Sequence, residues 1–196
     1  MTGPIKDGTG TGRFAEVDEA NKLATRATTS TEEHFISKED GLSFFANTTD
    51  TADTLTLASG NTYDMLYLKN THSSKNMVIE KVLSSSDTAG IIMRWTRNPT
   101  LGAVSNNNAH EPVNLNLGSS LAATGVFHSW DEVGTSGIGG LTGGTKIKTF
   151  INDLGFTAHP IDGAMVLTNG TSLMITLINN TGGAAEVELG VRFYYE

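Results

Sequence analysis

Five histidines carry the most versatile chemistry in this chain, and they stand singly at His34, His72, His110, His128 and His159. No two of them have the HxH or HExxH spacing that directs two imidazoles at one metal ion. The chain also has no cysteine, which excludes thiolate metal ligands and disulfide bonds. We therefore predict no metal site and no cofactor, and we expect the histidines to lie in loops or on the surface.

One short segment combines several reactive side chains, His128-Ser129-Trp130-Asp131-Glu132. An imidazole beside a carboxylate could act as an acid/base pair. The same residues also fit a hydrogen-bonded loop that packs Trp130 against the protein body, and we favour this second interpretation. The chain has no GxSxG motif, and no two carboxylates stand out as a glycosidase pair. We therefore predict no catalytic residues and a protein that is not an enzyme.

Trp95 and Trp130 are the main argument for a sugar-binding site, because indole rings can stack on sugars. A carbohydrate-binding module is therefore an alternative. However, Trp95 ends the apolar run 91–95, and a large aromatic side chain in such a run is normally buried in a core.

The overall composition restricts the partners of the chain. With 13 Lys and Arg against 21 Asp and Glu, the 196 residues have a formal net charge of −8, which disfavours binding to nucleic acid phosphates. No apolar run approaches the roughly 20 residues of a membrane-spanning helix. The polar, glycine-rich start lacks the apolar segment of a signal peptide. We expect no nucleic-acid or membrane partner, and synthesis in the cytoplasm.

β-Strand patterns dominate the chain from about residue 42. Short apolar or alternating runs bounded by Asn, Thr, Ser or Gly occupy residues 42–46, 54–58, 63–69, 77–83, 91–96, 146–151, 165–168, 173–178 and 185–193. The last run is the clearest, because every second residue from Val187 to Phe193 is apolar, whereas Glu186, Glu188 and Arg192 fall on the other face. One face of that strand should belong to a core and the other to solvent.

Two stretches interrupt the strand pattern, residues 98–116 and the glycine-rich residues 134–144. We predict both as loops, the second one exposed. No segment has a convincing helical pattern of ten or more residues. About eight to ten short strands without helices indicate an all-β fold, an antiparallel two-sheet sandwich that is jelly-roll-like.

The beginning of the chain differs from the rest, because it is polar and rich in Gly and Thr with few large apolar residues. We predict an extended N-terminal arm over residues 1–50 and a β-sandwich domain over residues 51–196. A short helix over residues 16–24 would fit their Ala and Glu content, but its apolar stripe is too thin to hold it alone.

A series of short motifs is distributed along most of the chain. They are Asp7-Gly8-Thr9-Gly10-Thr11-Gly12, Ala15-Glu16-Val17-Asp18, Asn21-Lys22-Leu23, Leu66-Tyr67-Leu68-Lys69-Asn70 followed by Met77-Val78-Ile79, Arg97-Asn98-Pro99-Thr100, and Ile178-Asn179-Asn180-Thr181-Gly182. Together they resemble a group of structural proteins of tailed-bacteriophage virions, the capsid decoration (cement) or head-fibre proteins. This resemblance implies a β-sandwich, often trimeric, that sits on a shell built by a different protein. It brings no catalytic residues.

Under this resemblance we expect a decoration protein that stabilises the shell and is located on the capsid surface of the virion, after synthesis in the host cytoplasm. Its expected partners are the major capsid protein and neighbouring copies of itself. A homotrimer is also favoured by the apolar ending Phe193-Tyr194-Tyr195. We expect the arm to contact the partners through Arg13, Phe14, Leu23 and Arg26. The alternatives are a tail or baseplate component and a carbohydrate-binding module on a virion.

Overall fold

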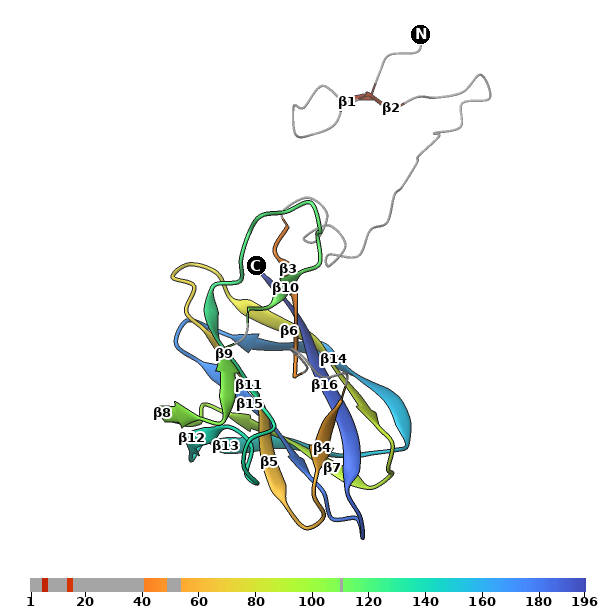
Figure 1. The fold of residues 1–196 in the computed structure, drawn as a ribbon. Coiled ribbons are helices and arrows are strands. Elements are labelled where there is room, and N and C mark those ends of the chain that lie inside the picture. Colours follow the sequence, from red (N-terminus) through yellow and green to blue (C-terminus); the bar gives the residue numbers. More distant parts are fainter. Residues whose placement is uncertain (1–4, 7–13, 16–40, 49–53, 110) are drawn as a thin grey trace, which may run out of the picture. The chain divides into compact units, whose positions relative to one another are not determined.

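The computed structural model describes residues 5–6, 14–15, 41–48, 54–109 and 111–196. The chain divides into two units, Met1–Thr31 and Glu32–Glu196. In the first unit, β1 (Ile5–Lys6) and β2 (Phe14–Ala15) pair antiparallel. The second unit holds all the other described strands (Figure 1). The described residues contain no helix that is long and apolar enough to span a membrane.

The first large sheet of the second unit has the spatial order β10-β3-β16-β6-β14, and β4 pairs with β16 beside β3. Its strands are β3 (Ser43–Asn47), β4 (Leu55–Leu57), β6 (Met77–Ser86), β10 (Val113–Asn114), β14 (Gly155–Leu167) and β16 (Ala185–Tyr195). The alternation in β16 is as predicted, because its odd-numbered residues from Ala185 to Tyr195 are buried. We call this sheet the first sheet.

The second large sheet has the order β13-β7-β15-β5-β11-β9. Its strands are β5 (Thr62–Asn70), β7 (Ile91–Arg97), β9 (Asn107–Ala109), β11 (Gly125–Trp130), β13 (Thr145–Asn152) and β15 (Ser172–Ile178). A separate pair consists of β8 (Thr100–Ser105) and β12 (Gly139–Thr142). All pairings within these named strands are antiparallel.

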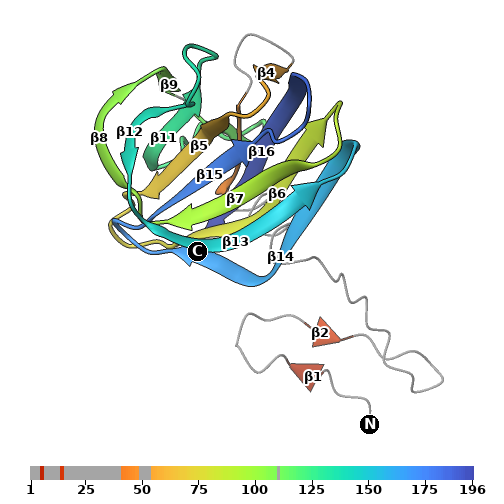
Figure 2. The same ribbon diagram turned by 90° about the horizontal axis from the view of Figure 1, so that it is seen from below.

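From β4 onward the connections between the long strands change sheets, except that β7 is followed, after an insertion, by β13 of the same sheet. The chain passes from β4 to β5 in the second sheet, back to β6, across to β7, and after an insertion from β13 through β14 and β15 to β16. The order β3/β4-β16-β6-β14 therefore faces β5-β15-β7-β13, which is the arrangement of an eight-stranded jelly roll (Figure 2). This confirms the predicted all-β, antiparallel, jelly-roll-like sandwich.

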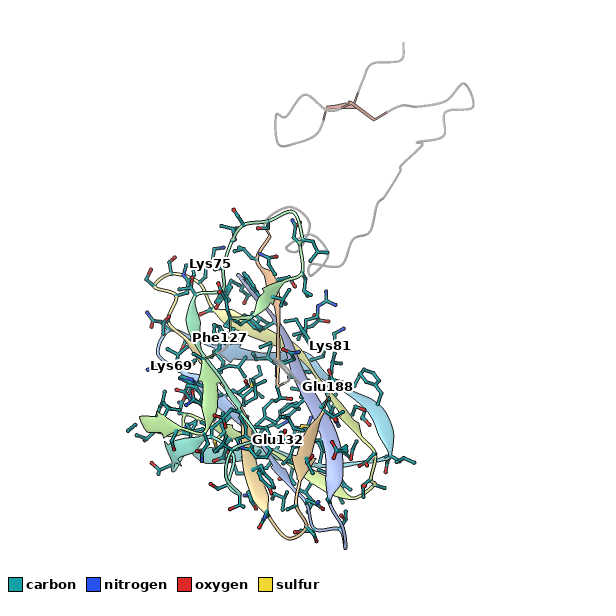
Figure 3. The ribbon with its side chains drawn as sticks, in the orientation of Figure 1. Lys69, Lys75, Lys81, Phe127, Glu132 and Glu188 are labelled. Atoms are coloured by element: carbon teal, nitrogen blue, oxygen red, sulfur yellow. The ribbon has the colours of Figure 1, made fainter. Side chains whose placement is uncertain are left out.

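An aromatic cluster forms part of the core between the sheets. The ring centroid of Phe193 on β16 lies 5.6 Å from that of Phe44 and 5.6 Å from that of Phe127. Phe127 reaches this cluster from β11, at the opposite sheet (Figure 3). Tyr195 packs edge-on against Phe193 and donates its hydroxyl to the carbonyl oxygen of Thr124 at 2.8 Å. The last strand therefore ties the two sheets together.

The glycine-rich segment 134–144 is only partly the exposed loop that we predicted. Gly137 and Ile138 are buried, and Gly139–Thr142 is strand β12. Gly137 forms an isolated parallel bridge with Asp64, and a Cβ atom at Gly137 would overlap the backbone of Asp64. Glycine is required there because two backbones approach closely at a positive φ. Part of this segment therefore packs against strand β5 of the second sheet.

The segment 98–116 also differs from the predicted loop, because it contains β8, β9 and β10. Leu101 and Val104 of β8, together with Leu141 of β12, pack against the core cluster. All seven residues of β15 are buried. A strand that is buried on both faces shows no alternation of apolar and polar residues.

The predicted boundary between arm and sandwich at residue 50 is too late in the chain. Ser43–Asn47 is already strand β3 of the first sheet, with Phe44 opposite Phe193 of β16. The apolar pairing across more than a hundred residues places β3 inside the sandwich. The remaining prediction for the arm, including a helix over residues 16–24, lies outside the described residues.

Candidate functional site

The predicted polar cluster at His128–Glu132 is a structural element. Trp130 is 1% exposed and donates its Nε1–H to the carbonyl oxygen of Val133 at 2.9 Å. The Trp130 ring lies 4.6 Å from the ring of Tyr63. Asp131 Oδ1 accepts the Val133 N–H at 3.0 Å, which closes a tight loop. This arrangement matches the hydrogen-bonded loop that we favoured.

The histidine and the carboxylates of that cluster do not form an acid/base pair. Glu132 Oε1 accepts the backbone N–H of Thr56 at 2.9 Å. The buried Nδ1 of His128 has no hydrogen-bond partner among the described residues. Burial lowers the pKa of His128, so the neutral imidazole is favoured. The described geometry therefore gives no proton relay at this position.

The other histidines have separate surroundings. His72 Nδ1 accepts backbone N–H groups of Ser74 and Lys75 at 3.2 and 3.1 Å, which fixes a turn. His159 is buried, contrary to the surface or loop position expected for it, because β14 carries it into the sandwich interior. His34 and His110 lie outside the described residues. Within the described ranges, no three His, Cys, Asp or Glu residues are grouped as a metal site.

The two tryptophans lie inside the protein. Trp95 is 1% exposed, and its ring packs 4.8 Å from the ring of Phe150. Trp130 is equally buried, as described above. Neither indole is therefore available on the surface as a stacking platform for a sugar.

The carboxyl group of Asp64, which lies on β5 of the second sheet, is partly buried. Burial raises its pKa, while the Thr176 hydroxyl, which donates to Asp64 Oδ1 at 2.7 Å, and the charge of Arg94 oppose this shift. The backbone of Asp64 bonds to Ser136 and Ile138, so the insertion lies directly over it. Because the group is covered by its own chain, we assign it a structural role.

Apolar side chains gather on the exterior of the consecutive strands β13 and β14, the edge strands of the two sheets. Five of the nine large apolar residues that are exposed within the described chain lie there, at Ile147, Ile151, Leu154, Phe156 and Val166. Leu154 and Phe156 are 68% and 69% exposed and flank the turn at Gly155. Exposed apolar groups concentrated on one element mark an interaction surface more often than scattered ones do.

Phe156 of β14 also belongs to an apolar surface on the outer face of the first sheet. Phe45, Leu83 and Phe156 surround Gly190 and line a shallow depression of about 60 Å³. Because Gly190 has no side chain, the ring of Phe45 lies in the position that a Cβ atom would take. Glu188 lies at its edge, next to Ser85. We call Phe45, Leu83, Phe156 and Gly190 the outer-face patch.

The rim of the outer-face patch is charged. Glu80 pairs with Lys81 at 2.7 Å and with Arg192 at 2.9 Å on the same sheet. Glu188 has no ion pair with any described residue. Figure 3 shows Glu188 and Lys81 on the β16 side of the sandwich. An apolar centre with an unpaired carboxylate at its edge is suited to contact with another protein that carries a cation.

The predicted contact residues of the arm belong to the first unit, Met1–Thr31. Arg13, Leu23 and Arg26 lie outside the described residues, and Phe14 is described only through its place in β2. Conversely, our sequence reasoning missed the outer-face patch. A signal was present in the segment 152–156, where Leu154 and Phe156 stand among Asn, Asp and Gly.

Comparison with known proteins identified no relatives. No protein family, no curated protein and no solved structure matches the chain.

Proposed function

We propose that this protein is a structural protein that binds other proteins and carries out no catalysis. The observation that carries the proposal is the outer-face patch on a rigid jelly roll, with the exposed Leu154 and Phe156 beside it. Aromatic and aliphatic side chains on a sheet provide contact area at little entropic cost, because the backbone already holds them in place. The carbohydrate alternative has less support, since both of its tryptophans lie in the interior.

Within this class, we propose a decoration protein on the capsid of a tailed bacteriophage. The support is the resemblance of its motifs, together with a jelly-roll body and an acidic chain with a formal net charge of −8. The partners would be the major capsid protein and neighbouring copies in a trimer. A shell under pressure from its packaged genome is weakest at its subunit junctions, and a protein that bridges them through several weak contacts would stabilise it.

The first test is the copy number of the protein in purified particles, measured by quantitative mass spectrometry against the most abundant shell protein. A comparable copy number is expected for a decoration protein. A ratio of a few per hundred would move the protein to the tail or to a vertex, which is the baseplate alternative. Its absence from particles would overturn the virion assignment.

A second test compares Phe156→Ser with Val133→Ser in particle binding. Both positions are exposed apolar residues, but Val133 lies in the loop after β11, away from the outer-face patch. We expect Phe156→Ser to weaken binding about tenfold or more and Val133→Ser to leave it unchanged. Equal binding by both variants would show that the outer-face patch does not contact the particle.

A deletion of residues 2–31 tests the arm separately. Full occupancy of the particles by that variant would exclude the arm as the anchor.

A further inference from the structure

A second cavity lies at the opposite end of β13 and β14 from the turn at Gly155 and is larger than the depression at the outer-face patch. Its volume is about 360 Å³, and residues from the ends of β7, β13, β14 and β15 line it. This size is at the lower end of the range for small-molecule sites. β13 and β14 are the edge strands of the two sheets and lie along the same side of the sandwich (Figure 2).

Irregularities in both edge strands flank the cavity. The pairing of β13 with β7 shifts between Lys146 and Lys148, which leaves Ile147 as an extra residue at the cavity. The pairing of β14 with β6 shifts between Pro160 and Met165, just before the residues of β14 that line it. Bulges of this kind re-aim side chains at functional sites. Because the pairing of both edge strands is irregular at this end of the sandwich, their side chains leave an open space instead of packing closely.

The lining combines an apolar part with a single cation. Leu167 and Leu173 are buried, and Ile147 and Val166 are partly exposed around them. Arg97 is exposed at the cavity, and no ion pair joins it to any described carboxylate. Hydroxyl groups come from the turn between β14 and β15, where Thr171 donates its hydroxyl to the Thr168 carbonyl at 2.8 Å. The Thr171 oxygen can still accept a hydrogen bond.

The surroundings of the cavity are cationic although the chain is acidic. Lys146 and Lys148 stand on β13, and Thr145 of the same strand pairs with Arg97. The three cationic residues are backbone neighbours on β7 and β13 in a chain whose formal net charge is −8, and the Nζ of Lys148 lies over the rings of Trp95 and Phe150 at 5.7 and 4.6 Å. The local charge therefore favours an anion over a cation as the ligand.

We propose that this cavity binds a small organic carboxylate with an apolar chain. The guanidinium of Arg97 would hold the carboxylate by a bidentate hydrogen bond, and the chain would lie against Leu167, Leu173 and Ile147. A sugar fits less well, because no aromatic side chain is among the described residues that line the cavity. This inference is independent of the proposed function, since the cavity does not include the outer-face patch.

The test uses octanoate as the probe and the full chain as the protein, with binding followed by amide chemical shifts in NMR titrations. We expect saturable shifts for residues 167–173 with octanoate and at least about tenfold weaker binding of octan-1-ol and octylamine, which lack the anion. Arg97→Gln should weaken octanoate binding about tenfold and leave octan-1-ol binding unchanged. Lys81→Gln makes the same charge change on the first sheet and should have no effect.

Two further outcomes decide the proposal. Ile147→Trp fills the cavity from a partly exposed position and should abolish the shifts, while its unchanged spectrum elsewhere would show that the variant is folded. The proposal is overturned if octanoate causes no saturable shifts at residues 167–173 up to about 10 mM. It is equally overturned if octylamine binds as well as octanoate, or if Arg97→Gln binds octanoate as the unchanged chain does.

Discussion

The ring of Phe45 lies over Gly190 on the outer face of the first sheet, in the position that a side chain at residue 190 would need. The two residues stand on the paired strands β3 and β16, where Gly190 is directly opposite Asn47 and Phe45 is opposite Arg192. An aromatic ring that covers a glycine on a neighbouring strand restores the packing that glycine lacks. The outer-face patch therefore depends on the smallest and one of the largest side chains of the sheet.

Gly190→Ala is expected to destabilise the protein, because the added methyl group must displace the ring of Phe45. Overpacking of this kind costs about 1–3 kcal/mol. Urea unfolding measures the loss, and Gly182→Ala is the matched control because a Cβ atom at Gly182 meets nothing within 4 Å. The double variant Phe45→Ala/Gly190→Ala should lose less than the sum of the two single variants. Additive losses would show that the ring and the methyl group do not compete.

Sugars are expected to leave the tryptophan fluorescence unchanged, because Trp95 and Trp130 are both 1% exposed. Acrylamide should quench the emission only weakly in the folded protein and strongly in urea. A titration with soluble mono- and oligosaccharides measures the emission maximum directly. A saturable shift with one sugar would restore the carbohydrate-binding alternative.

His159→Gln is expected to reduce the loss of stability in mild acid. Burial, followed by the charge of Lys148, lowers the pKa of His159 below its ordinary value of 6.5. The unfolded chain therefore takes up a proton near pH 6.5 while the folded protein does not, so the stabilisation is complete above that value and declines as the pH falls below it. The Nε2 atom of His159 lies 3.2 Å from Asn152 Oδ1 and 3.4 Å from Ser84 Oγ, contacts that a glutamine amide can replace in part.

Urea unfolding between about pH 7 and pH 5 tests this prediction. His128 has a pKa shift in the same direction, so His128→Gln serves as a comparison and should flatten the same part of the profile. An identical pH dependence for His159→Gln and the unchanged protein would mean that His159 accepts a proton in the folded state as easily as in the unfolded chain.

Asp64→Asn is expected to stabilise the protein at neutral pH. Burial raises the pKa of Asp64 above its ordinary value of 3.8, so this carboxyl group binds a proton more readily in the folded protein than in the unfolded chain. Its contribution to stability is complete below about pH 3.8 and is lost as the pH rises through the folded pKa. The asparagine oxygen can still accept the Thr176 hydroxyl. Thermal unfolding should show a gain at pH 7 that shrinks in acid. A loss at pH 7 would mean that the charge of Arg94 outweighs the cost of burial.

Local patterns predicted the strands well where one face is wet and the other dry. The alternating run 185–193 became part of β16 and the run 91–96 became part of β7, whereas the run 63–69 became part of β5, in which residues 65–68 are all buried. β15 was predicted from its apolar length instead of its alternation. The strands of the insertion were missed because Gly, Asn and Thr dominate them, and these residues pair there only because the second sheet supplies a surface to cover.

The candidate site was less predictable than the fold. The patch joins Phe45, Leu83, Phe156 and Gly190, which come from four strands, and their proximity depends on the register of each pairing. A shift of one residue in any of those strands would turn its member of the patch toward the core. The cavity beside Arg97 depends in the same way on the irregular pairing of β13 with β7 and of β14 with β6, which no local sequence motif indicates.

The sequence by itself determined that this protein is an all-β sandwich without cysteine chemistry, because composition and alternation act over a few neighbouring residues. Only the tertiary structure decided which strands pair, where the sandwich begins and which apolar residues remain outside. Thr48, for example, exchanges hydrogen bonds with the backbone of Leu189, 141 residues away. Contacts at such separations arise when the whole core closes, so the surfaces that they create exist only in the folded protein.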